Sequence, residues 1–122
     1  MAHRILIVDD ERELCDLVAM DLEAEGFEVT TKYSGNQAIA ELKAHPAFDL
    51  ILSDVRMADG DGVALLNFVQ TMSEPRPPIL MISGFSDINE AQIISKGGRG
   101  LLSKPIDFDV LIERINKEIA SK

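Results

Sequence analysis

The sequence has little cysteine and little basic charge, and both shortages narrow the class of protein. Cys15 is the only cysteine among 122 residues, so no disulfide can form within the chain, as is usual in a reducing cytoplasm. We interpret it as a small apolar side chain on a helix. Only 12 lysines and arginines stand against 21 acidic residues, a formal net charge of −9. Nucleic-acid binding needs clustered basic residues, so we expect none by this domain.

Long apolar runs and a secretory signal are missing as well. The apolar runs fall far short of the roughly 20 residues of a transmembrane helix, and the N-terminus lacks a signal-peptide pattern. We therefore expect a soluble, cytoplasmic protein without membrane contacts. Internal repeats and linkers are also absent, and the length suits one domain, so residues 1–122 are predicted to form a single domain.

Short apolar segments alternate with segments of helical period along the chain. The segments 4–8, 50–52 and 79–82 are continuously apolar, which is typical of strands covered on both faces of a parallel sheet. The segment 27–32 alternates apolar and polar residues, which suits an edge strand. A fifth short strand is predicted at 100–103.

Helix signals fill the intervals between these strands. Gly26 is predicted to stop the first helix, a capping box at 34–37 to open the second, Pro46 to end it, and Asp61 to cap the third. The segment 86–96 carries the weakest helical pattern. The residues expected to face inward are Leu14, Leu17, Val18 and Leu22; Val63, Leu66 and Val69; Ile88, Ala91 and Ile94; and Phe108, Leu111, Ile112, Ile115 and Ile119.

Five alternating strand–helix units predict a doubly wound (βα)5 fold of the α/β class. With right-handed crossovers this is a flavodoxin-like three-layer sandwich with a parallel sheet. Among the common strand orders we predict 2-1-3-4-5, because it puts the alternating segment 27–32 at an edge. Ligands of such sheets bind beyond the carboxyl ends of the strands, where the strand order reverses. That point lies between the strands predicted at 4–8 and 50–52.

Both of these strands end in acid. Asp9 and Asp10 follow the first, and Asp54 follows the third. Two carboxylates about 4 Å apart repel by roughly 4 kcal/mol at an effective dielectric near 20. Three converging acids therefore indicate a cation, and oxygen ligands without histidine or cysteine favour Mg²⁺. For Asp10 alone, capping of the following helix is an equal alternative.

The last two strands end in groups that suit an anion. The fourth ends in Ser83-Gly84 and the fifth in Ser103-Lys104-Pro105. A lysine before proline is usually a solvated loop charge, but at an acidic rim its ammonium can be held inward. A hydroxyl, an ammonium and a hard cation describe a site for a phosphoryl group. Nucleotide-binding glycine motifs are absent, whereas a carboxylate can itself accept a phosphoryl group.

Five short motifs occur in order at these strand ends: Val8-Asp9-Asp10-Glu11, Ser53-Asp54-Val55-Arg56-Met57, Gly60-Asp61-Gly62, Met81-Ile82-Ser83-Gly84 and Ser103-Lys104-Pro105. With them the chain resembles, over essentially its full length, the CheY-like receiver domains of response regulators in two-component signalling. The resemblance implies that Asp54 accepts a phosphoryl group. It implies Mg²⁺ ligation by Asp10, Asp54 and the backbone carbonyl of Arg56, with Asp9 helping through water. It also implies that Ser83 and Lys104 bind the transferred phosphoryl group.

The same resemblance implies partners. A histidine kinase or histidine phosphotransfer protein would supply the phosphoryl group, and a downstream protein or output domain would read a changed surface, with dimerisation on phosphorylation as one form of output. The domain would be a signalling module that assists its own phosphorylation and dephosphorylation, and not a conventional enzyme.

One alternative is a metal-dependent phosphatase or phosphotransferase, which generally needs an acid where Arg56 stands. Another is a pseudo-receiver that works without phosphorylation, which the intact acids disfavour.

Three positions depart from the pattern of the family. Ala58 replaces the usual proline, Gly97-Gly98 replaces glycine–alanine, and Leu101 stands where an aromatic switch residue is typical. In most of the family, this aromatic ring fills the space that the serine hydroxyl vacates on phosphorylation. Leucine is smaller and cannot fill that space in the same way. We therefore predict that displacement of the segment 84–98 transmits the signal.

Overall fold

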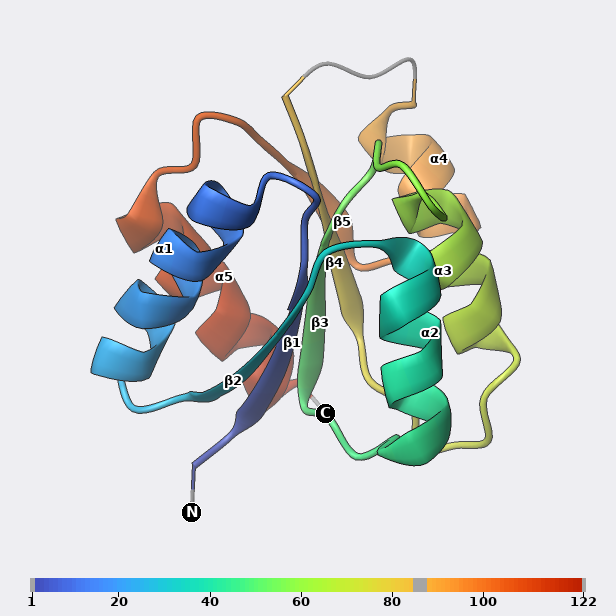
Figure 1. The fold of residues 1–122 in the computed structure, drawn as a ribbon, viewed down its shortest axis with the longest axis horizontal. Helices are drawn as coiled ribbons and strands as arrows, with labels where there is room; N and C mark the ends of the chain where they lie inside the picture. Colours follow the sequence, from blue (N-terminus) through green and yellow to red (C-terminus); the bar gives the residue numbers. More distant parts are fainter. Residues whose placement is uncertain (1, 85–87, 122) are drawn as a thin grey trace.

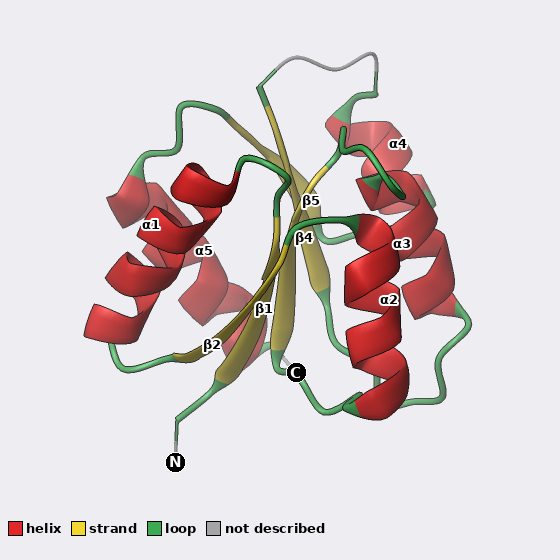
Figure 2. Cartoon of the chain, in the orientation of Figure 1, coloured by secondary structure: helices red, strands yellow, loops and turns green. Residues whose placement is uncertain are grey.

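The computed structural model, which describes residues 2–84 and 88–121, is a five-stranded parallel sheet between two layers of helices (Figures 1 and 2). The strand order is β2-β1-β3-β4-β5, so the predicted fold is confirmed. The elements are β1 Arg4–Val8, α1 Arg12–Ala24, β2 Glu28–Lys32, α2 Gly35–Ala44, β3 Leu50–Asp54, α3 Gly62–Gln70, β4 Ile79–Ser83, α4 Glu90–Ser95, β5 Gly100–Ser103 and α5 Phe108–Ala120. None of the helices in the described part of the chain is long and apolar enough to cross a membrane.

The sheet separates two hydrophobic cores. Alternate residues of a strand point to opposite faces, so Leu6 of β1 packs with α2, α3 and α4, whereas Ile5 packs with α1 and α5. The three central strands are almost completely buried, and β2 at the edge is only half-buried. This difference matches the continuous and alternating patterns of the sequence.

The register of the strands sets the level of the functional residues. Val8 of β1 pairs with Ser53 of β3, so Asp9 and Asp54 follow paired positions. Ser83 of β4 pairs with Ser103 of β5, immediately before Lys104. The parallel sheet therefore brings residues from four separate segments to one rim.

Most helix ends lie where the sequence predicts them. The side chains of Ser34 and Asp61 accept hydrogen bonds from the first turns of α2 and α3, and Gly26 follows α1 with a φ of 97°. The capping box of α2 differs in detail, since the Gln37 side chain accepts from the N–H of Tyr33 and not from that of Ser34. This hydrogen bond therefore fixes Tyr33, the residue before the N-cap.

Two predicted inward faces are partly wrong. Leu17 is 56% exposed because it lies about 140° around the axis of α1 from the buried Leu22, and Cys15 takes an inward position instead. In α4 the buried residue is Ile93, and Ile94 is 54% exposed. Ala91 is exposed too. Ile88 precedes the helix but is half-buried against the core, and residues 86–87 of the predicted segment lie outside the described residues.

Candidate functional site

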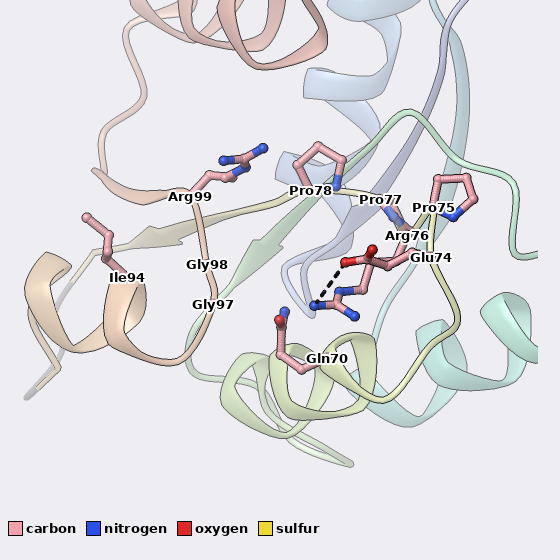
Figure 3. A pocket seen from close by; sticks show the side chains of 10 residues that line it. All are labelled: Gln70, Glu74, Pro75, Arg76, Pro77, Pro78, Ile94, Gly97, Gly98 and Arg99. Carbon is pink, nitrogen blue, oxygen red and sulfur yellow. Dashed lines mark ion pairs between the residues drawn. The ribbon is translucent and has the colours of Figure 1, made fainter. Parts of the chain in front are cut away.

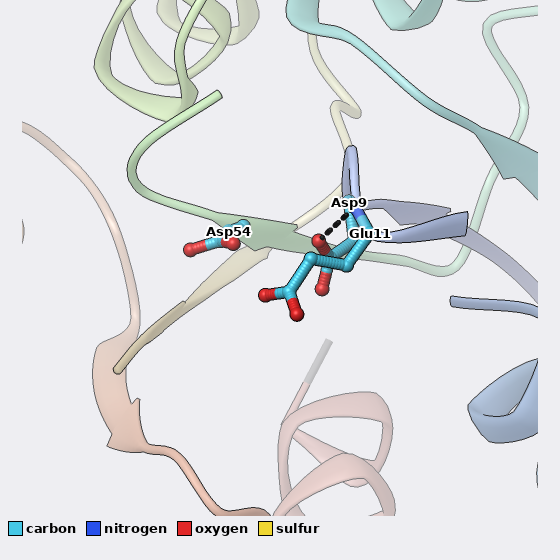
Figure 4. Close-up of side chains that lie close together, drawn as sticks. All are labelled: Asp9, Glu11 and Asp54. Atoms are coloured by element: carbon cyan, nitrogen blue, oxygen red, sulfur yellow. Dashed lines mark hydrogen bonds between the residues drawn. The ribbon is translucent and has the colours of Figure 1, made fainter. Parts of the chain in front are cut away.

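Three carboxylates converge at the carboxyl end of the sheet. Asp9 follows β1, Asp54 ends β3, and Glu11 stands at the start of α1 (Figure 4). One carboxylate oxygen of each lies within 4.8 Å of the others. Asp9 and Asp54 are only 6% and 7% exposed. The rim is thus a partly buried concentration of negative charge that requires compensation.

The ammonium of Lys104 provides that compensation. Its Nζ lies 2.9 Å from Asp54 Oδ2, 2.9 Å from Glu11 Oε1 and 3.2 Å from Asp9 Oδ2. The side chain is 14% exposed, so the alternative of a solvated loop charge is wrong. An ammonium has three N–H donors, and here each has a carboxylate partner. The point on which these carboxylates converge therefore already holds a positive charge.

The shared environment changes the pKa values of both partners. Burial by itself lowers the pKa of Lys104, but the hydrogen bonds that its ammonium donates to Glu11 and Asp54 and the nearby acidic charges outweigh burial, and the pKa is raised. Burial raises the pKa of Asp9, and the charge of Asp54 adds to this, against the N–H of Glu11 and the charge of Lys104. Lys104 consequently remains charged, whereas ionised Asp9 carries a desolvation cost.

Asp10 faces the loop after β3 and lies outside the three-carboxylate cluster. Its exposed carboxylate accepts a hydrogen bond from the N–H of Ala58 at 3.2 Å, two residues beyond Arg56. The N-cap residue of α1 is Glu11, so the alternative in which Asp10 caps this helix is wrong. Asp10 is thus placed beside the loop that carries Arg56.

The loop after β3, residues 55–61, is held by the start of α2, a connection that the sequence did not reveal. Ser34 Oγ and Asn36 Nδ2 donate to the carboxylate of Asp59, both at 3.0 Å. The backbone N–H groups of Gly35 and Asn36 donate to the carbonyls of Gly60 and Asp59 at 2.8 and 3.1 Å. Asp59 has a φ of 58° and Gly60 one of 94°. Only the turn dipeptide Asp59-Gly60 hinted at this geometry.

Helix α3 begins at Gly62, and the surroundings of this residue show why it is a glycine. A Cβ atom at this position would meet the backbone carbonyl of Asp54 and the side chain of Met81. The N–H of Gly62 also donates to the carbonyl of Val55 at 2.8 Å. The helix can therefore start directly against the backbone of Asp54 only without a side chain at residue 62.

Ser83 joins the rim through the backbone. It is buried at the end of β4, and its carbonyl accepts a hydrogen bond from the N–H of Lys104 at 2.9 Å. Of the predicted site residues, Asp9 and Asp54 contact Lys104 directly, and Ser83 adjoins Lys104 through its backbone carbonyl. Asp10 instead bonds to Ala58 in the loop that carries Arg56. Glu11 belongs to the cluster, but sequence reasoning singled it out only as part of a motif.

A hollow of about 850 Å³ lies at the other end of the sheet, where the chain enters β4 and β5 (Figure 3). Its lining includes Gln70, Pro78, Gly98 and an ion pair of Arg76 with Glu74 at 3.8 Å. A smaller hollow of about 510 Å³ includes Glu11 and Lys104 and continues over apolar residues of α1 and α5. The smaller hollow is the one that adjoins the acidic rim.

Comparison with known proteins places this geometry in a family. The family model "Response regulator receiver domain" matches residues 5–116. The transcriptional regulatory protein ZraR of Salmonella typhimurium is 38% identical over 117 residues, which cover 95% of this chain and 26% of that protein. The nitrogen assimilation regulatory protein NtrX of Azorhizobium caulinodans is 37% identical over 115 residues, 92% of this chain and 25% of that protein. The chain thus spans about a quarter of the length of these relatives.

Solved structures give the same result. A CheY-like response regulator receiver domain protein from Methanospirillum hungatei superposes with a TM-score of 0.89 at 27% identity, over 99% of this chain and 96% of the other. The receiver domain of NtrX from Brucella abortus superposes with a TM-score of 0.86 at 31% identity, over 97% of this chain and 99% of the other.

Proposed function

Because the chain belongs to the response regulator receiver domain family, we propose that its phosphoacceptor is Asp54. The contact of Asp54 Oδ2 with Lys104 Nζ at 2.9 Å carries this proposal, since an acceptor needs a cation beside the oxygen that receives the phosphoryl group. Asp9 is less suited, because its Oδ1 accepts the N–H of Glu11. Asp10 is committed to the N–H of Ala58.

The donor set fits a hard divalent cation, and we assign Mg²⁺ to it. Asp10, Asp54 and the backbone carbonyl of Arg56 would hold the ion, with Asp9 acting through water; all of these donors are oxygen atoms. The contact of Asp10 with the backbone of Ala58 supports this set, since it brings the carboxylate to the loop of Arg56. When bound, the ion neutralises charge on the phosphoryl oxygens.

Asp54, Lys104 and Ser83 have separate roles in the proposed phosphoryl transfer. A carboxylate oxygen of Asp54 forms a bond to phosphorus while the bond from phosphorus to the imidazole nitrogen of a phosphohistidine breaks, and the freed imidazole keeps the electron pair. The ammonium of Lys104 donates to a phosphoryl oxygen, and the hydroxyl of Ser83 donates to another. Both groups stabilise the added charge and draw the ends of β4 and β5 towards it.

The proposed donor is a histidine kinase or a histidine phosphotransfer protein. The proposed recipient of the signal is an output domain or a separate protein, and dimerisation on phosphorylation is one form of it. That the matched relatives are about four times as long as this chain supports a further module as the recipient. Residues 1–122 would form the receiver domain, which is a signalling domain and not a conventional enzyme.

Acetyl phosphate with Mg²⁺ tests the assignment of Asp54. Intact-protein mass spectrometry should show one added phosphoryl group that hydroxylamine removes, as an acyl phosphate requires. Asp54→Asn should remain unmodified, and Asp21→Asn, an exposed aspartate on α1, should be modified like the wild type. Equal modification of Asp54→Asn would show that another residue accepts the group.

A further inference from the structure

Glu11 occupies a position that its residue type serves poorly. It is the N-cap residue of α1, yet its side chain makes no capping hydrogen bond. Serine, threonine, aspartate and asparagine are preferred there because their short side chains reach the free N–H groups of the first turn. The carboxylate of Glu11 instead reaches Lys104 Nζ at 2.9 Å. The longer side chain is explained by that contact and not by the helix.

The three partners of Lys104 differ in how freely they can leave it. The side chains of Asp9 and Asp54 are 8% and 9% exposed, whereas that of Glu11 is 62% exposed. A buried carboxylate that loses its partner is left in a poorly solvated place, which is costly. The carboxylate of Glu11 can return to water at little cost. Glu11 is therefore the partner that Lys104 can exchange most readily.

We propose that Glu11 is a positioning residue that holds the Lys104 ammonium in the unphosphorylated domain and competes with the phosphoryl group for it. The inference rests on the proposed role of Asp54 and Lys104. All three donors of the ammonium are engaged by carboxylates, so a bond to a phosphoryl oxygen requires that one of them be released. Glu11 thereby sets how readily the phosphorylated arrangement forms.

A different role for Glu11 predicts the opposite sign. As a ligand of the metal, it would strengthen binding of Mg²⁺ and of a phosphoryl analogue, and its neutralisation would weaken both. As a competitor for Lys104, its neutralisation strengthens binding of the analogue. The sign of the change therefore separates the two roles.

The sign can be measured by calorimetric titration of the protein with beryllofluoride at saturating Mg²⁺. Glu11→Gln is expected to bind the analogue roughly two- to fivefold more tightly, the range expected for one partly exposed ion pair. Glu13→Gln is the matched control, because it removes the same charge from an exposed glutamate in the first turn of the same helix. It should change affinity by less than about 1.5-fold, since exposed charges are screened.

The outcomes are distinct. Failure of the wild type to bind beryllofluoride would contradict the proposed function itself. Binding by the wild type together with equal or weaker binding by Glu11→Gln would overturn only the role of Glu11. A change of equal size in Glu13→Gln would also overturn it, because the effect would then be one of general charge.

A spectroscopic measurement without analogue or metal tests the contact directly. The ¹H–¹⁵N signal of the Lys104 ammonium reports exchange of its protons with water, which hydrogen bonds to carboxylates slow. Glu11→Gln should accelerate this exchange, and Glu13→Gln should not. Unchanged exchange in Glu11→Gln would mean that Glu11 does not hold the ammonium, and would overturn the proposal.

Discussion

The loop after β3 and helix α4 lie beside the same sheet but are held in very different ways. Four hydrogen bonds join residues 59–60 of the loop to residues 34–36 at the start of α2. Helix α4 has six residues, and only Ile93 among them is buried. The loop carries the groups proposed for chemistry, which need fixed positions, whereas α4 has the sparse packing of elements that move.

A side chain of α4 bonds directly to the backbone of β5. Glu90 Oε2 accepts a hydrogen bond from the N–H of Leu101 at 3.0 Å, and Arg114 of α5 donates to the carbonyl of Arg99 at 2.6 Å. The first bond occupies a backbone group of the edge strand, which would otherwise be open to pairing, and the second lies just before that strand. Gly98 packs directly against Ile93. One apolar side chain and one carboxylate of α4 thus make close contacts with β5 and the residues before it.

The largest expected contrast comes from a pair of glycine substitutions. Gly62→Ala places a methyl group against the backbone of Asp54, so we expect a loss of about 3 kcal/mol or more in unfolding free energy. Gly98→Ala mainly meets the side chain of Ile93, with no backbone atom as close, and should cost less, about 1–2 kcal/mol. Urea unfolding of both variants measures the difference. Equal losses would contradict the view that the loop region is the more rigid of the two.

Removal of Asp10 should act on metal binding and spare the fold. Asp10→Ala is expected to lower Mg²⁺ affinity by more than about tenfold, because the ion loses a charged oxygen ligand. Among the described residues the exposed side chain makes one hydrogen bond, to Ala58, and the loss of repulsion among acids offsets that bond. Calorimetry with Mg²⁺ and thermal unfolding in EDTA check the two parts. If Asp10→Ala binds Mg²⁺ with wild-type affinity, the assignment of Asp10 to the metal site is wrong.

The side chain of Asp59 tests the hold of α2 on the loop. Asp59→Gly removes the hydrogen bonds to Ser34 and Asn36 while tolerating the positive φ of 58°, and should cost about 1–2 kcal/mol in unfolding free energy. Asp59→Asn keeps one acceptor oxygen and should cost less. If the Mg²⁺ affinity of Asp59→Gly stays at the wild-type value, the hydrogen bonds between Asp59 and the start of α2 stabilise the fold but do not position the metal site.

The raised pKa of Asp9 predicts a pH dependence of stability. The folded state binds the proton of Asp9 more readily than the unfolded state, so the stabilising contribution of this group is present below the unfolded pKa and is lost as pH rises through the folded pKa. Asp9→Asn should therefore gain stability over the wild type at pH 7 in EDTA, and the gain should shrink towards pH 3–4. Urea unfolding across this pH range would show it. A gain that is independent of pH would contradict the sign.

The smallest effect concerns the contact between α4 and β5. Glu90→Gln weakens the acceptor for the N–H of Leu101 by a few tenths of a kcal/mol up to about 1 kcal/mol, which should speed amide hydrogen exchange in α4 and β5 but not in residues 55–61. In the wild type, beryllofluoride should change protection mainly within 83–105. If protection changes elsewhere and not in this region, α4 does not transmit the signal.

Much of the fold was readable from local patterns. Continuous apolar runs marked the central strands, and the alternating run marked β2, because burial on one or both faces acts on each strand separately. Helix periodicity was less decisive. The inward placement of Leu17 and Ile94 was wrong because neighbouring apolar residues leave the direction of the buried face open, and only packing against the sheet selects Cys15 and Ile93.

The candidate site divides in the same way. The sequence by itself determined which acids end strands β1 and β3 and that a lysine follows β5, because a parallel sheet must bring these ends to one rim. Only the tertiary structure decided that the ammonium of Lys104 bonds three carboxylates, that one belongs to Glu11, and that Asp59 is bound by α2. These contacts join residues far apart in the chain, and their partners depend on side-chain reach and backbone turns that no local pattern specifies.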